Sequence, residues 1–199
     1  MPKSILVLPP LNESPDVNAP YSYLSTVTRP LAERGYYVFP VSVVDAFLKE
    51  NGLPTPGEMH QVPLDRVRDL IGADAVLYLK IDQYGTTYQI FNSQTIVEVE
   101  GRLVDVNTGT TIWSGRRHTV QNSSGGQDNI IGMLVGALVS QVAHTVADYA
   151  HDLSRQVNTG MIFDDRTGFL SGHYHPGYEK DQRRRHEVQE KLLAKRRAQ

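Results

Sequence analysis

The side chains best suited to chemistry are histidines and carboxylates in the second half of the chain. His144 and His151 lie seven residues apart in a segment with helical spacing, and Asp148 follows His144 by four residues, so the three share one helix face. A zinc site on that face would need a third ligand and a water-free set of hydrogen-bonded groups around the ligands. A polar stripe on the solvent side of the helix explains the same spacing, and we favour it over a metal site.

A second group of possible metal ligands is His173-x-His175, which follows the acids Asp164 and Asp165. The intervening glycine-rich segment gives these side chains little reason to hold a fixed geometry, so a metal-dependent enzyme is the less favoured alternative. We predict no catalytic residue, no cofactor and no bound metal.

The familiar catalytic motifs are absent from the sequence. There is no cysteine, which excludes disulfides, thiolate nucleophiles and cysteine-bound zinc. G-x-S-x-G, the Walker loop and G-x-G-x-x-G are also missing, so hydrolase, NTPase and dinucleotide-binding functions have no support and no small-molecule substrate is evident. The members of a Ser-His-Asp triad meet only in three dimensions, so spacing along the chain does not decide that question.

The composition is that of a globular protein, with 40% hydrophobic and 21% charged residues in 199. No apolar stretch is long enough to span a membrane, and no signal peptide or lipobox cysteine is recognised. Residues 179–199 hold eight Lys or Arg and four acids, so this stretch is basic and the rest of the chain is acidic. We expect a solvated tail there, and no nucleic-acid partner, because aromatic residues and a basic body are lacking.

The candidate residues must be positioned by a scaffold that alternates strands and helices in the first half of the chain. Apolar runs and helical spacing predict strands at 4–8 and 36–41 and helices at 21–34, 43–51 and 64–71. Pro30 is expected to kink or restart the first helix, and Ser42 is the expected N-cap of the second. The proline-containing segment 53–62 is expected to be a loop.

Four strands in succession are predicted in the middle of the chain, at 75–81, 87–91, 95–106 and 110–120. Glu98 and Glu100 alternate with Val97 and Val99, which indicates antiparallel pairing with one dry face and one wet face. The segment 107–109 ends in glycine and joins the last two strands as a hairpin. We interpret this hairpin as part of a core rather than a membrane barrel, because several charges would otherwise face lipid or lumen.

A long helix is predicted from about 128 to 157. Its apolar stripe contains Ile131, Val135, Leu138, Val142, Val146, Tyr149 and Leu153. Further apolar residues and the small residues Gly132 and Gly136 fall near its start, where another backbone could approach closely. The predicted interaction face consists of Ile130, Gly132, Leu134, Gly136 and Val139. A tight contact of the same helix with its own sheet is the open alternative.

We divide the chain into a single αβ ectodomain at 1–160, an irregular C-terminal strap at 161–181 and a charged tail at 182–199. The strap is expected to pack on the body through Phe163, Phe169 and Leu170.

Three pieces of the sequence resemble a family of bacterial outer-membrane lipoproteins of unknown function, known mainly as a candidate surface antigen. They are ILVLPPLNESPDVNAPYSYLSTVTRPLAERGYYVFPV, DAVLYLKI and VEVEGRLVDVNTGTTIWSG. The resemblance implies a fold like the N-terminal domain of TolB: an α/β (α+β) domain with a mixed, largely antiparallel sheet of five to six strands flanked by helices. RLVDVNTGTTIWSG is also similar to segments of the secretion lipoprotein CsgG and of LpoB.

The family resemblance implies a lipid anchor upstream of this sequence, at the outer membrane, with the domain facing the periplasm or the cell surface. The expected function is therefore non-enzymatic protein–protein interaction or envelope assembly, with self-association among the expected contacts. A subunit of a CsgG-like secretion or pore assembly is the alternative that rests on likeness of fold.

Overall fold

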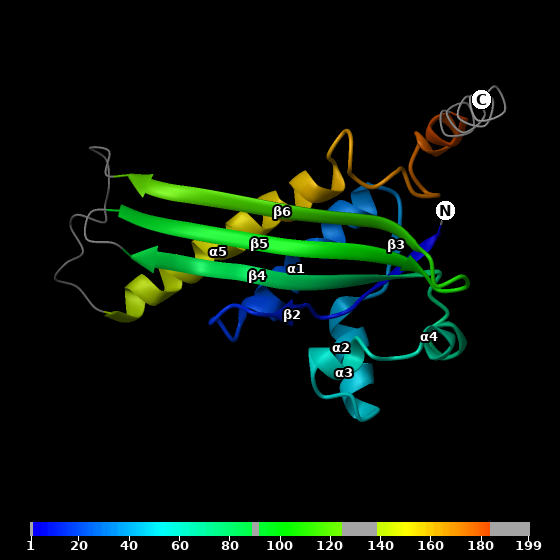
Figure 1. Ribbon diagram of the computed structural model, residues 1–199, viewed down its shortest axis with the longest axis horizontal. Helices are drawn as coiled ribbons and strands as arrows, with labels where there is room; N and C mark the ends of the chain where they lie inside the picture. The colour runs from blue at the N-terminus through cyan, green and yellow to red at the C-terminus, as the bar shows by residue number, and fades with distance from the viewer. Residues whose placement is uncertain (1, 89–91, 125–138, 184–199) are drawn as a thin grey trace, which may run out of the picture.

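The computed structural model describes residues 2–88, 92–124 and 139–183 (Figure 1). The first half forms short parallel strands joined by a helix: β1 (Ser4–Val7), β2 (Leu11–Asn12), α1 (Ala19–Glu33) and β3 (Tyr37–Val38). α1 buries Tyr23, Val27 and Leu31 at helical spacing, and it continues through Pro30. The chain then turns at Gly35, whose φ of 88° suits glycine.

Three helices follow: α2 (Val41–Glu50), α3 (Pro56–Met59) and α4 (Leu64–Leu70). The expected N-cap at Ser42 is wrong, because α2 begins after Pro40, which lies at the cap position without a side-chain hydrogen bond. The expected loop at 53–62 contains the single turn α3. Thr55 accepts a hydrogen bond from the Glu58 backbone and the Glu58 side chain accepts one from Thr55, so a capping box forms this turn.

Three long strands make up the rest of the sheet: β4 (Ala75–Tyr88), β5 (Asn92–Asp105) and β6 (Thr111–Ser124). β4 runs on to Tyr88 through a bulge between Ile81 and Gln83, so the prediction of a separate strand at 87–91 is wrong for residues 87 and 88. Residues 89–91 lie outside the described part of the chain. Gly85, with φ of 122°, lies in the continued part of β4. The predicted hairpin is confirmed, with Gly109 at φ of 67°.

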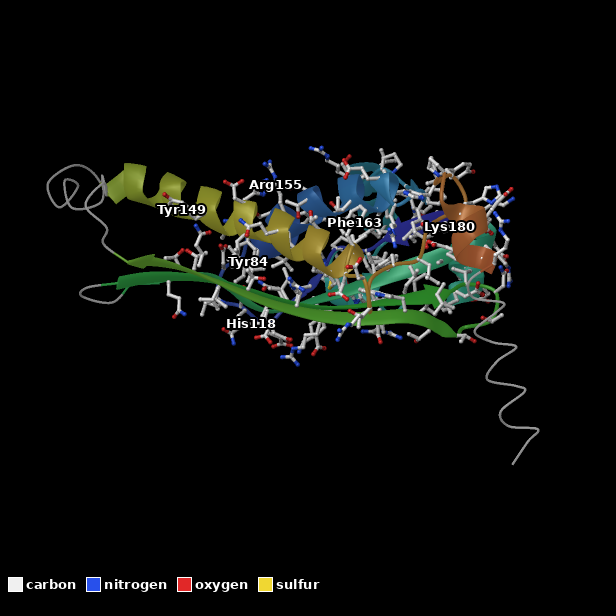
Figure 2. The ribbon with its side chains drawn as sticks, turned by 90° about the horizontal axis from the view of Figure 1, so that it is seen from above. Tyr84, His118, Tyr149, Arg155, Phe163 and Lys180 are labelled. Atoms are coloured by element: carbon white, nitrogen blue, oxygen red, sulfur yellow. The ribbon has the colours of Figure 1, made fainter. Side chains whose placement is uncertain are left out.

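The sheet has six strands in the order β3-β1-β4-β5-β6, with β2 added beside β4. β1 pairs in parallel with β3 and β4, whereas β4, β5 and β6 are antiparallel. The predicted α/β class, with a mixed and largely antiparallel sheet flanked by helices, is confirmed. Figure 2 shows α5 and α1 on one side of the sheet and His118 on the opposite side. We call these the inner and the outer face.

The main core lies between the inner face and the helices α1 and α5 (Val139–Ile162). α5 extends beyond the predicted end at Val157, and the predicted segment 128–138 lies outside the described residues. Leu153 and Val157 are buried as an apolar stripe requires, but Tyr149 is 42% exposed, so its assignment to that stripe is wrong. Each fully buried aliphatic side chain contributes roughly 1.5–3 kcal/mol.

A smaller core lies on the other side of β1 and the start of β4, under α2, α3 and α4. Val76 and Tyr78 belong to it, whereas the outer-face residues further along β4 are not covered by these helices. Among the described residues, no helix combines the length and hydropathy needed to cross a bilayer.

The segment after α5 crosses the sheet near the start of β6. Phe169 is buried, with its ring centroid 4.2 Å from that of Trp113, and the Trp113 indole donates a hydrogen bond to Thr167 O at 2.7 Å. Tyr36 donates to Leu170 O and Arg34 donates to Phe169 O, so the segment is bonded to the chain that follows α1.

Candidate functional site

The outer face of β4, β5 and β6 carries three consecutive rows of polar side chains. Alternation along each strand turns every second residue outward, and the registers align the rows across the three strands. The rows are Tyr78–Arg102–Ser114, Lys80–Glu100–Arg116 and Gln83–Glu98–His118, with Asp82 at the bulge. Among the described residues, no helix or strand lies in front of these rows in Figure 1.

Arg116 is the centre of an ion-pair network in these rows. Its guanidinium nitrogens lie 2.7 Å from Glu100 Oε1, 2.8 Å from Glu98 Oε1 and 3.4 Å from Asp82 Oδ2. The hydrogen bond to Glu98 is the main reason why the pKa of Arg116 is raised, with smaller effects of the surrounding carboxylates. Because the three carboxylates stand at different positions on β4 and β5, together they hold the Arg116 guanidinium in one orientation.

Two further pairs flank the network. Lys80 Nζ donates to Asp82 Oδ1 at 2.8 Å, and this bond raises the pKa of Lys80. His118 Nδ1 lies 3.4 Å from the second oxygen of Glu98. The carboxylate of Glu98, whose side chain is only 12% exposed, is thus shared between Arg116 and His118.

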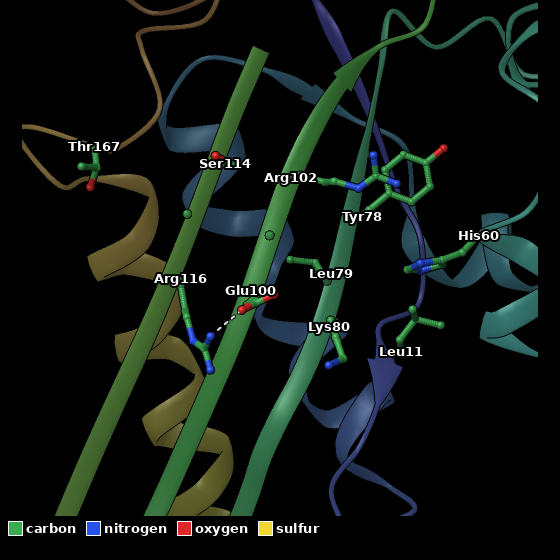
Figure 3. A pocket seen from close by; sticks show the side chains of 12 residues that line it. Leu11, His60, Tyr78, Leu79, Lys80, Glu100, Arg102, Ser114, Arg116 and Thr167 are labelled. Carbon is green, nitrogen blue, oxygen red and sulfur yellow. Dashed lines mark hydrogen bonds and ion pairs between the residues drawn. The ribbon is translucent and has the colours of Figure 1, made fainter. Parts of the chain in front are cut away.

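A groove of about 710 Å³ runs over this face and reaches His60, the residue after α3 (Figure 3). At that end the Arg102 guanidinium lies over the Tyr78 ring, with Cζ 4.5 Å from the ring centroid. His60 meets the same ring edge-on at 5.3 Å, and its Nε2 lies 2.9 Å from Pro9 O. Burial lowers the pKa of His60, and the charge of Arg102 adds a smaller effect in the same direction.

Arg102 differs from the other cations of the groove. Lys80 and Arg116 have carboxylate partners, whereas no carboxylate in the described ranges forms an ion pair with Arg102. The Tyr78 ring fixes the plane of the Arg102 guanidinium, whose N–H groups can donate two parallel hydrogen bonds to one carboxylate. The face therefore offers fixed charges and an aromatic ring for binding.

A buried polar seam joins α1 to α5 on the inner side. Tyr23 donates to Asn158 Oδ1 at 2.7 Å, and Asn158 Nδ2 donates to Thr26 Oγ1 at 2.7 Å. All three side chains are buried, and burial strongly raises the pKa of Tyr23. Each of the three side chains is hydrogen-bonded, with Thr26 Oγ1 donating to Tyr23 O, so the role of this seam is to fix the register of the two helices.

His151, one of the possible metal ligands, is half-buried and bridges the same two helices through Ser22. Arg155 can only donate, so its contact of 3.2 Å makes His151 Nε2 an acceptor and, in the neutral ring, leaves the proton on Nδ1. Nδ1 then donates to Ser22 Oγ at 3.3 Å, which is opposite to the direction a general base requires. Ser22 and His151 are therefore arranged as structural hydrogen-bond partners.

The other side chains considered as possible metal ligands lie apart from His151. Asp164 accepts hydrogen bonds from the backbones of Thr167 and Arg166, and these bonds lower its pKa. His175 Nδ1 accepts one from Gly177 N. Among the side chains that the structure describes, no group of three His, Asp or Glu could hold a metal ion.

Several sequence-based sites lie outside the described residues. They include the side chains of His144 and Asp148 and the predicted interaction face: Ile130, Gly132, Leu134, Gly136 and the side chain of Val139. The outer-face network was not predicted, although the alternation of Glu98 and Glu100 indicated a wet face. Its signal is the combination of that alternation with Arg116 directly across the hairpin from Glu100.

Residues 1–174 match the family described as "Putative lipoprotein GNA1162-like", and the chain belongs to this lipoprotein family. "Putative lipoprotein NMB1124/NMB1162" of Neisseria meningitidis serogroup B (strain ATCC BAA-335 / MC58) is 43% identical over 172 residues, covering 86% of this chain and 80% of that protein. The resemblance expected from the sequence is confirmed.

The crystal structure of lipoprotein GNA1162 from Neisseria meningitidis is similar to this fold, with a TM-score of 0.59 and 45% identity over 72% of this chain and 99% of that chain. The C-terminal domain of LpoB from Salmonella enterica matches with a TM-score of 0.40 and 21% identity, over 59% of this chain and 82% of that domain. At that TM-score the likeness to LpoB supports no argument about this chain.

Proposed function

We propose that this chain is the ectodomain of a lipid-anchored envelope protein that binds protein partners through the outer face and performs no catalysis. The observation that carries the proposal is the contrast between the two faces of β4–β6. The inner face is filled by α1 and α5, whereas the outer face beyond Tyr78 holds an ordered set of ion pairs that no described helix covers.

The ordered ion pairs favour binding for an energetic reason. Immobilising a free side chain on association costs about 0.5–1.5 kcal/mol, and Arg116, Glu98 and Lys80 are already held by their partners. The stacked guanidinium of Arg102 is similarly oriented before any partner arrives. Arginine and tyrosine are enriched where partners contribute most to binding energy.

Membership of a lipoprotein family supports an anchored location in the envelope. We place the anchor at the outer membrane, with the domain in the periplasm or on the cell surface, as the resemblance implies. Fractionation of native membranes on a density gradient tests this: co-migration with inner-membrane markers contradicts the outer-membrane assignment.

Site-specific photocrosslinking in the native cells tests the binding function. A photoreactive residue replaces His118 on the outer face, or Arg155 on α5 as the matched control; their side chains are 49% and 64% exposed. We expect a discrete crosslinked protein from position 118 and none from position 155. Crosslinks from position 155 alone would place the binding surface on α5 and refute the proposal.

The small-residue patch at Gly132 and Gly136, with Ile130, Leu134 and Val139, remains a proposed second contact on sequence grounds. Gly136→Leu is expected to lower the oligomer mass in light scattering while leaving the circular dichroism unchanged. A wild-type chain that is monomeric would remove this second contact.

A further inference from the structure

Two charges remain without an ion-pair partner in the described part of the groove and its border: Arg102 and Glu13. Glu13 follows β2, and its backbone N–H donates to Ile81 O at 2.9 Å. Leu11 is in register with Lys80, so alternation places Glu13 on the outer face. The charge of Glu13 contributes to the raised pKa of Lys80, which indicates that the two lie near each other.

Arg102 and Glu13 lie on opposite sides of Lys80. Arg102 is on β5 opposite Tyr78, whereas Glu13 is beside β4, beyond Ile81. With strands ~4.8 Å apart and a rise of ~3.3 Å per residue, the two positions are about 16 Å apart on a diagonal. Among the described residues, the outer face therefore has a cation without an ion pair on β5 and an anion without an ion pair at the end of β2, outside the groove lining.

We propose that the outer face binds a second copy of this chain, face to face, about a two-fold axis that lies between the sheets and passes near Lys80. This proposal rests on the proposed function, which makes the outer face a protein interface. The axis brings Arg102 of each copy opposite Glu13 of the other, so both unpaired charges gain partners. Lys80 and Asp82 lie near the axis, so Lys80 of each copy can pair with Asp82 of the other instead of its own.

The overall charge of the face favours a second copy over a strongly charged partner. The face carries three cations and four carboxylates, so its net charge is close to zero. The cations are Lys80, Arg102 and Arg116, and the carboxylates are Asp82, Glu98, Glu100 and Glu13. Two copies therefore repel each other little, whereas a highly acidic or basic surface would find no matching excess.

Charge reversal tests the proposal by sedimentation velocity on the full 199-residue chain, up to about 100 μM. We expect the wild type to dimerise and Arg102→Glu and Glu13→Arg each to weaken dimerisation by at least about tenfold, because like charges then face each other twice. An equimolar mixture of the two variants is expected to dimerise again, as is the double variant. Arg66→Glu, on α4, is the matched control and should leave the dimer unchanged.

The proposal is overturned by a monomeric wild type, by single variants that dimerise normally, or by a mixture that stays monomeric. A dimer that survives both outer-face variants but is lost in Gly136→Leu places the contact on the predicted helix patch. A monomeric chain that still crosslinks to a different protein from position 118 refutes the second copy and leaves the proposed function standing.

Discussion

Tyr23→Phe tests the buried seam that fixes α5 on α1. The substitution removes one hydroxyl and leaves the shape of the ring, but it deprives Asn158 Oδ1 of its donor in a site with no exposure. Leaving a buried acceptor without a partner costs about 1–3 kcal/mol, so we expect the free energy of unfolding to fall by that amount. Urea denaturation followed by circular dichroism measures it.

A double-mutant cycle with Asn158→Leu identifies the cause. Asn158→Leu removes the acceptor, so the subsequent loss of the Tyr23 hydroxyl should cost less than it does in the wild type. We expect a coupling energy of about 1–2 kcal/mol. Additive effects, or a Tyr23→Phe variant within about 0.5 kcal/mol of wild type, would refute the assignment of the seam as a stabilising hydrogen-bond network.

The pH dependence of the same variant gives a second result. Burial raises the pKa of Tyr23 in the folded chain, so above the ordinary tyrosine value the unfolded chain binds fewer protons than the folded one. The stability difference between wild type and Tyr23→Phe should therefore be independent of pH below pH ~10, and above it wild type should lose ~1.4 kcal/mol per pH unit relative to Tyr23→Phe. A stability difference that stays constant above pH ~10 would contradict the burial of this hydroxyl.

Three shorter predictions concern the strap and the outer face. Gly35→Ala should destabilise the chain more than Gly52→Ala, because both glycines have positive φ but only at Gly35 would a Cβ clash with the strap; equal losses in urea denaturation contradict the contact. Asp164 has a lowered pKa in the folded chain, so the stability that its carboxylate contributes is lost only as the pH falls below the ordinary aspartate range. The fluorescence of Trp113, the single tryptophan, should report this loss of stability in wild type but not in Asp164→Asn. Arg116→Met leaves Glu98 and Glu100 without an arginine partner and Asp82 with Lys80 alone, so its thermal midpoint should rise with salt more than that of wild type; identical salt dependence contradicts the network.

Local patterns predicted the hairpin of β5 and β6 because both of its signals lie close together in the chain. The alternation around Glu98 and the glycine at Gly109 act within a few residues, and the structure confirms both. The assignment of Tyr149 to the buried stripe failed because periodicity gives the spacing of a helix face but not the width of the surface that covers it.

Other features depend on cross-strand register or on competing local signals. Arg116 reaches Glu98, Glu100 and Asp82 only because three strands are aligned, and the bulge that turns Asp82 outward has no clear sequence signal. The turn α3 was readable from Thr55 and Glu58, but the prolines around it favoured a loop. The ring of Tyr78 under Arg102 likewise follows from register.

The claim that the outer face is the binding surface can be tested most directly by cysteine protection, because the chain has no cysteine of its own. The His118→Cys and Arg155→Cys variants are labelled with a maleimide in native membranes and as dilute purified chain. We expect the His118→Cys variant to be labelled at least about tenfold more slowly in membranes, because the residues around a protein interface keep water and reagent out of its centre. Labelling of the Arg155→Cys variant should be equally fast in both settings. Equal labelling rates for the His118→Cys variant in both settings would contradict the account.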